Sequence, residues 1–322
     1  MNVLFLHRRR YGVVALLTLL LGIAGCGTTK PEQAITQQAA RSDNLRPTSV
    51  DALVADAMQR HFAQHDTEQA LQVLKVALGK AQDRPDIAWL YSQLCALSPG
   101  CEPEPAEARL RKLDPGNGIA WLGALGRARA RADVPAEYQI LEAMSRSQNF
   151  NLYWNSLLWR LGIAISQSQS ALTPNALMDP LTSGLNESVG WLSSIALPAF
   201  QPLREACSGA GTSGPSLRTD CTRISDAMRR SDTYIVEGLG LGIAQRLTQP
   251  STPAAVQVEQ QITVSRYQRE TATNVIEAQV ERQKFSQQMV ELMKKLPREQ
   301  DVFLTVLRWS GSSLRPSDKK SQ

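Results

Sequence analysis

From about residue 50 onward, apolar residues recur every three or four positions, the spacing that places them on one face of an α-helix. The first such segment follows Ser49 or Asp51, either of which can cap the start of a helix. No stretch shows clear period-two alternation, so strands are not expected. The pattern therefore predicts an all-α protein. Further helices are expected at 67–78, 105–113, 135–147, 181–197, 200–206, 218–229, 234–247 and 301–309.

An internal repeat is visible between residues 50 and 170. The sequence Ile-Ala-Trp-Leu at 87–90 recurs thirty-two residues later at 119–122, and Tyr153-Trp154 falls near the next step. Each of the first two Trp-containing helices is followed by a second expected helix. A period of this length, built from helix pairs, is typical of an α-solenoid, because one pair alone cannot bury its apolar face.

These residues resemble the tetratricopeptide repeat (TPR) family. The Trp early in the first helix of a pair, the Leu113–Asn117 junction and Ala132-Asp133 between helices all match that family's pattern. The Gly and Tyr that should follow the Trp are missing or shifted, and the first loop carries an insertion at 95–101. The resemblance implies a TPR-like helical-repeat solenoid over 50–170. The alternative is an irregular bundle of similar helices.

The longest uninterrupted segment, 254–296, contains neither Gly nor Pro. Its apolar residues keep helical spacing, and a single very long C-terminal helix of about 65 Å is expected. The apolar stripe could pack against earlier helices or pair with a second copy as a coiled-coil homodimer. A less regular helical region, 171–253, precedes this segment. Region 254–313 then comprises the long helix and one short helix, and 314–322 is a polar tail.

The N-terminal residues have the pattern of a secretory signal peptide. Three arginines at 8–10 precede an apolar run that ends in small residues just before Cys26. The run Val13–Ala24 is only twelve residues long, whereas a membrane-spanning helix needs about 20. The sequence Ile-Ala-Gly-Cys at 23–26 resembles a bacterial lipobox. This resemblance implies that 1–25 is removed and that Cys26 is acylated, with 26–49 as a flexible tether.

The remaining cysteines form two locally spaced pairs. Cys95 and Cys101 flank a short turn, and Cys207 and Cys221 flank a loop rich in Gly, Ser, Thr and Pro. An exported protein lies in an oxidising compartment, so we expect disulfides Cys95–Cys101 and Cys207–Cys221. Four free buried thiols are the alternative.

The net charge of +5 does not indicate a nucleic-acid partner. Residues 1–25 hold three of the 35 basic residues and no acidic one, which leaves 32 basic against 30 acidic side chains. So small an excess is no electrostatic footprint for nucleic acid.

Candidate catalytic and metal-binding motifs are weak. His61 and His65 lie one helical turn apart, but Gln64 stands where a zinc protease would need Glu, and no third ligand is evident. The sequence G-x-G-x-x-G at 209–214 has no preceding strand, so a disulfide loop is the better interpretation than a phosphate site. We expect no catalytic residue, no metal and no cofactor. Trp89, Trp121 and Trp154 are expected in the core; a binding groove is the alternative.

Lipoproteins with TPR-like repeats serve, as families, as pilotins, barrel-assembly components and activators of cell-wall synthases. The resemblance implies a non-enzymatic scaffold that faces the periplasm and binds envelope proteins. A cell-wall hydrolase with an unrecognised carboxylate site and a self-associating structural lipoprotein are the alternatives. Gly27 stands where Asp would retain a lipoprotein in the inner membrane of enteric bacteria, so the outer membrane is expected.

The lipid anchor gives the first testable prediction. Two or more acyl chains on Cys26 would give stable membrane attachment, whereas one gives only marginal binding. Replacing Cys26 with Ser should block both acylation and cleavage at this site. Mass spectrometry of the membrane-bound protein checks this, and an unmodified Cys26 in the wild type would contradict it.

Overall fold

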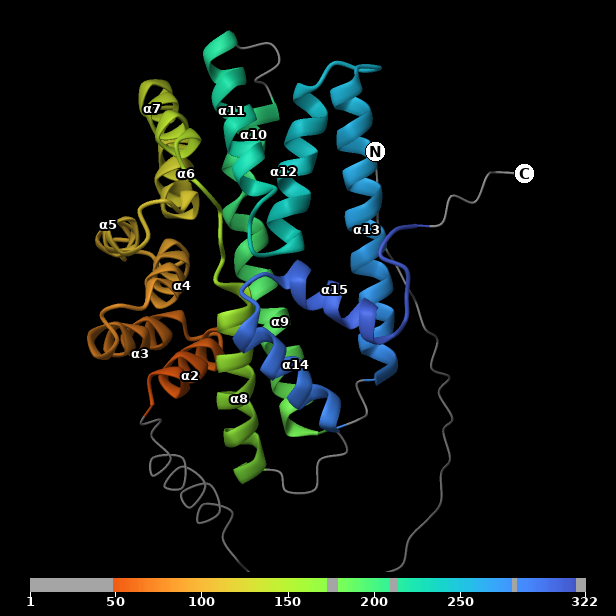
Figure 1. The fold of residues 1–322 in the computed structure, drawn as a ribbon. Coiled ribbons are helices and arrows are strands. Elements are labelled where there is room, and N and C mark those ends of the chain that lie inside the picture. Colours follow the sequence, from red (N-terminus) through yellow and green to blue (C-terminus); the bar gives the residue numbers. More distant parts are fainter. Residues whose placement is uncertain (1–48, 173–178, 209–213, 280–282, 317–322) are drawn as a thin grey trace, which may run out of the picture. The chain divides into compact units, whose positions relative to one another are not determined.

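The computed structural model describes residues 49–172, 179–208, 214–279 and 283–316, and within them the predicted all-α fold is confirmed: these residues form helices and no strand (Figure 1). The first half comprises α2 (Val50–Ala63), α3 (Thr67–Lys80), α4 (Pro85–Ala96), α5 (Glu104–Leu113), the 3₁₀ turn η1 (Gly118–Trp121), α6 (Leu122–Ala130) and α7 (Val134–Ser145). The second half comprises α8 (Trp154–Leu172), α9 (Pro180–Ala199), α10 (Gln201–Ser208), α11 (Pro215–Met228), α12 (Tyr234–Leu247), α13 (Pro253–Gln279), α14 (Gln283–Lys295) and α15 (Glu299–Trp309).

Three helices of the first half, α2, α3 and α7, begin at side-chain caps. Ser49, one of the two predicted caps, accepts a hydrogen bond from the backbone N–H of Ala52, and Asp66 and Asp133 cap α3 and α7 in the same way. Each cap satisfies one N–H group that the first turn of a helix leaves without a partner. The local sequence therefore defines where these helices start.

Helices α2 to α6 pack mainly on their neighbours in sequence, α2 on α3, α4 on α5, and α6 on α7, whereas α7 packs on α11 as well as on α6. Contacts between consecutive helices are typical of helical repeats, but the predicted TPR-like solenoid is not confirmed by them. Helix α8 lies back against α2, and α9 contacts α4, so the later helices cover the first ones. Asp51 marks this closure, because its carboxylate accepts Nη1 of Arg84 at 2.9 Å and Nη1 of Arg160 at 3.1 Å.

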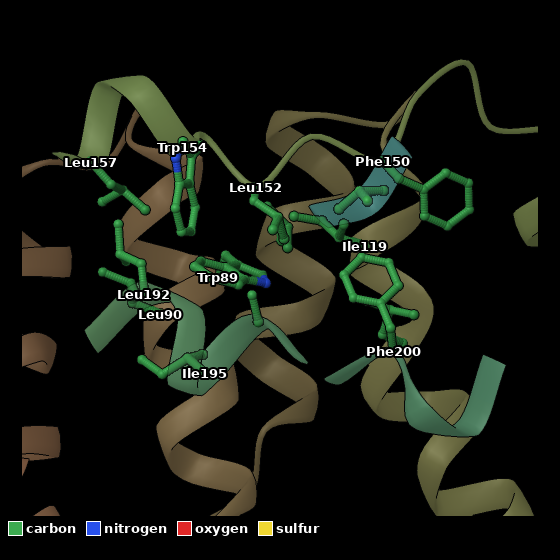
Figure 2. Packing of buried hydrophobic residues seen from close by; sticks show 14 of the residues in the cluster. Trp89, Leu90, Ile119, Phe150, Leu152, Trp154, Leu157, Leu192, Ile195 and Phe200 are labelled. Carbon is green, nitrogen blue, oxygen red and sulfur yellow. The ribbon is translucent and has the colours of Figure 1, made fainter. Parts of the chain in front are cut away.

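The main apolar core lies where the first half meets α8 and α9. Trp89 is fully buried there, and Figure 2 shows its ring between Leu152 and Trp154 on one side and Ile195 of α9 on the other. Helices α8 and α9 approach closely because position 184 is Gly. A Cβ atom there would lie 2.5 Å from the carbonyl oxygen of Gly162.

The predicted single helix over 254–296 is not confirmed. The described residues form α13 and α14, which lie on either side of 280–282 and run at an angle to each other (Figure 1). Their surroundings explain the change of direction, because α13 packs on α12 and α15 whereas α14 packs on α8, α9 and α15. Only two residues of α13, Val258 and Ala272, are buried, so this helix is a partly covered edge of the fold.

A buried loop between α11 and α12 joins three helix starts. In this loop Ser231 and Thr233 are fully buried and Asp232 is 4% exposed. The two carboxylate oxygens of Asp232 accept the backbone N–H groups of Leu152 at 2.8 Å and Trp154 at 2.9 Å, the latter being the first residue of α8. We call Ser231, Asp232 and Thr233, together with the first residues of α8, α12 and α15, the Asp232 junction.

The same junction holds α12 and α15. The Glu299 carboxylate accepts the backbone N–H of Tyr234, the first residue of α12, at 2.8 Å. In return the N–H of Glu299, at the start of α15, donates to the carbonyl oxygen of Asp232 at 2.8 Å. Thr233 caps α12 with its hydroxyl group. The starts of α12 and α15, which are distant in sequence, are therefore joined by hydrogen bonds between their polar groups.

The junction gives the second testable prediction. In the Asp232→Asn variant, only one of the two oxygens remains as an acceptor, and an NH₂ group would face a buried backbone N–H. We expect the free energy of unfolding to fall by about 1–3 kcal/mol, the cost of a buried unsatisfied donor. Urea unfolding at neutral pH measures it.

Asp83→Asn is the matched control for this measurement. Asp83 is exposed, and its side chain has no partner among the described residues. Its substitution should change stability by no more than about 0.5 kcal/mol. Equal losses in both variants would contradict the role given to Asp232.

Candidate binding grooves

An open groove of about 1090 Å³ lies in the described part of the chain. We call it the α13 groove, since the stretch of α13 between Val256 and Gln268 forms one wall. The other walls come from the end of α11 with the two residues after it, from Glu237 and Leu241 of α12, and from Arg315-Pro316. Its volume is slightly above the range of about 300–1,000 Å³ that is typical of ligand sites.

Most of the residues that line the α13 groove carry polar side chains. Arg229 spans it, with one guanidinium nitrogen 3.0 Å from Asp226 and another bonded to Gln261 of α13. Gln268 donates to the carbonyl oxygen of Leu314 at 3.0 Å and thereby ties the C-terminal segment to α13. The geometry suits recognition of a polar, extended ligand by hydrogen bonds and charge.

The Asp232 junction also supports this groove. Glu237 of α12 lines the groove and accepts a hydrogen bond from Nε2 of Gln300 at 2.7 Å. A residue of α15 therefore holds the side chain of a groove residue in place. Burial raises the pKa of Asp232 to about 6, although the N–H groups of Trp154 and Leu152 oppose this shift. Burial likewise raises the pKa of Glu299 to about 7, with the nearby charge of Asp232 adding to the shift.

A second, smaller hollow of about 450 Å³ lies where α13, α14 and α15 meet. Val275, Phe285, Val306 and Trp309 contribute its apolar lining, and Trp309 is 55% exposed. Phe285 is only half-buried at this rim. An exposed Trp at the rim of an apolar hollow is compatible with contact to another molecule.

The predicted cysteine pairs are both found at disulfide distance. Cys95 and Cys101 are bonded with their Cα atoms 5.3 Å apart, and Cys207 and Cys221 with theirs 5.6 Å apart. The first pair closes the turn after α4, and the second joins α10 to α11. Cys26, the predicted lipidation site, lies outside the described residues.

The weak motifs lie apart from both hollows. Nδ1 of His61 lies 3.0 Å from Oγ1 of Thr67, and the pKa of His61 is lowered by burial and by the nearby His65. The described residues contain no group of three or more His, Cys, Asp or Glu placed to hold a metal ion. In the Gly-rich motif, 209–213 lie outside the described residues, and Gly214 is the N-cap of α11, which follows helix α10 and not a strand.

The tryptophans of the repeat have different environments. Trp89 is fully buried and Trp154 is 3% exposed, so both are core residues as predicted. Trp121 is only half-buried, and the guanidinium of Arg111 lies 4.7 Å from its ring centroid. Such a cation–π contact covers one face of a partly exposed indole. Among the described helices, none is long and apolar enough to cross a membrane.

Sequence reasoning did not find the α13 groove. Most of the residues that α13 contributes to it are Gln, Glu, Ser and Thr at helical spacing, which is also the pattern of an ordinary solvated helix face. The sequence carries no local signal for the groove, because the stretch 256–268 has an ordinary apolar content. No protein-family model, no curated protein and no solved structure matches this chain.

The raised pKa of Glu299 gives the third testable prediction. An unfolded Glu titrates near 4.3, so the fold favours the protonated acid. Its contribution to stability is full below about pH 4 and is lost as the pH rises through about 7. Gln at this position keeps an acceptor for Tyr234 but cannot ionise. We therefore expect Glu299→Gln to gain about 1–3 kcal/mol relative to the wild type between pH 5 and pH 8.

Urea unfolding at several pH values measures this difference. Glu68→Gln serves as the control, because Glu68 is exposed on α3 and has no side-chain partner among the described residues. That variant should follow the wild-type pH dependence. A Glu299→Gln variant with an unchanged pH slope would show that Glu299 titrates normally in the folded protein.

Proposed function

We propose that this protein is a lipid-anchored, periplasm-facing helical scaffold that binds partner proteins of the cell envelope and does not catalyse a reaction. The observation that carries this proposal is the α13 groove, an open polar hollow of about 1090 Å³ with exposed cationic and amide side chains. Specific binding sites combine such concavity with a few polar groups that fix orientation.

The proposed location rests on the N-terminal sequence and on the cysteines. The resemblance of 23–26 to a lipobox supports acylation of Cys26, and Gly27 supports the outer membrane. The bonded pairs Cys95–Cys101 and Cys207–Cys221 support an oxidising compartment, because disulfides are rare in the cytosol.

We further propose that α2 to α7 derive from degenerate TPR-like repeats. The helix pairs, the Asp133 cap between α6 and α7, and the buried Asn117 at the junction between pairs support this. Nδ2 of Asn117 donates to the carbonyl oxygen of Asn151 at 2.9 Å, and to Asp114 at 3.1 Å. Asn117, the last residue of the Leu-Asp-Pro-Gly-Asn sequence, thus links this junction of the repeat to the next one.

Purification of the full-length acylated protein from envelopes solubilised in mild detergent tests the binding function. We expect a second envelope protein in stoichiometric amount. As a control, the Cys26→Ser variant should not reach the membrane fraction, and its preparation identifies proteins that adhere to the affinity matrix.

Two other outcomes would contradict the proposal. Recovery of copies of this chain alone would favour a self-associating structural lipoprotein, including a homodimer through the C-terminal helices. Turnover of isolated cell wall by the purified protein would favour the hydrolase alternative.

A further inference from the structure

The carboxylates that line the α13 groove are all engaged by side chains of the protein itself. Asp226 accepts from Arg229 at 3.0 Å, Glu237 from Gln300 at 2.7 Å, and Glu259 from Gln245 at 3.1 Å. Each of these carboxylates therefore has a partner within the fold, and Asp226 is paired with a positive charge.

Two arginines of the groove are not engaged. Arg230 follows α11 and Arg315 lies in the C-terminal segment, and both are exposed. Neither guanidinium has a side-chain or backbone partner among the residues that the structure describes. A guanidinium offers five N–H donors in a planar fork that matches a carboxylate. Two positively charged groups of the groove are therefore free to bind a ligand.

The wall formed by α13 adds groups that suit a polypeptide. Gln257 and Gln260 lie one helical turn apart, are exposed, and have no side-chain partner among the described residues. Primary amides can donate to a peptide carbonyl and accept from a peptide N–H. Val256, which is 53% exposed, gives the same wall an apolar contact.

The facing helix leaves this space open. Gly238 and Gly242 share a helical face with Gln245, which reaches α13. A Cβ atom at either glycine would meet nothing within 4 Å, whereas one at Gly240 would lie 2.8 Å from Met228. Packing therefore requires Gly only at 240, although each Gly weakens a helix by about 1 kcal/mol. The other two glycines border open space on this face of α12.

We propose that the α13 groove binds an extended segment of a partner protein that carries at least two carboxylates, one held by Arg230 and one by Arg315. The backbone of the segment lies along Gln257 and Gln260, and a small apolar side chain contacts Val256. This proposal rests on the proposed function, because it names the class of ligand that the scaffold recognises. An anionic polysaccharide shares the charge but lacks the regular amide groups that the two glutamines complement.

Site-specific photocrosslinking in the cells that produce the protein tests this proposal. The full-length chain carries benzoylphenylalanine in place of Gln260, an exposed groove residue, and irradiation is followed by mass spectrometry of the adduct. Charge reversal in the double variant Arg230→Glu/Arg315→Glu should lower the adduct yield by about tenfold or more, since it replaces two attractive contacts with repulsive ones. The fold should be retained, because both side chains are exposed.

The matched control is Arg223→Glu/Arg266→Glu. These arginines lie on α11 and α13, are exposed and do not line the groove, so the control makes the same change in net charge. Its adduct yield should stay within about twofold of the parent. The crosslinked partner segment should contain at least two Asp or Glu residues, and their replacement by Lys should restore the adduct with the charge-reversed groove.

The proposal is overturned by an adduct with polysaccharide only, by no adduct, or by equal losses in the two double variants. A second probe at Tyr138, which is 43% exposed on α7, separates the two claims. If a stoichiometric partner copurifies and crosslinks only at Tyr138, the groove assignment fails and the binding function stands. If no partner copurifies and neither probe reacts with protein, both fail.

Discussion

The fold depends on one buried carboxylate that holds the start of a helix far away in sequence. Asp232 receives two backbone N–H groups at the beginning of α8, and this helix then packs on α9, α2 and α14. A buried charge is costly unless hydrogen bonds compensate it, so the position tolerates few other side chains. The pKa of about 6 reflects that balance, because burial raises it and the two N–H groups lower it.

The junction also connects the helices that border the α13 groove. Glu299 binds the start of α12, and Gln300, the next residue of α15, binds Glu237 in the groove wall. The groove is therefore placed by polar contacts behind it, and α13 itself contributes little to the core. A helix with one buried side and one polar side is well suited to present a binding surface without loss of stability.

Local signals in the sequence predicted the helices well. The expected helix 234–247 has the bounds found for α12, Ser49 caps α2, and both cysteine pairs are joined as expected. Each of these features depends on residues that are near one another in the chain. Helical periodicity, capping and short cysteine spacing can therefore be recognised without knowledge of the tertiary structure.

Features that depend on distant partners were not predicted. Asp232 looks like any loop aspartate in the sequence, and its importance arises from contact with residues about 80 positions earlier. The separate directions of α13 and α14 likewise follow from their different neighbours, which periodicity cannot specify. Trp121 occupies the position in the repeat that matches Trp89. Trp89 is buried in the core, whereas Trp121 lies at the surface, where Arg111 covers its ring.

The central claim is that the Asp232 junction holds the starts of α8, α12 and α15 together in the native state. Native-state hydrogen exchange of the backbone amides of Leu152, Trp154 and Tyr234 tests it most directly. These amides should exchange as slowly as those of the core helices, because they open only with global unfolding. Exchange as fast as in exposed loops would show that the junction opens locally, and would contradict this account of the fold.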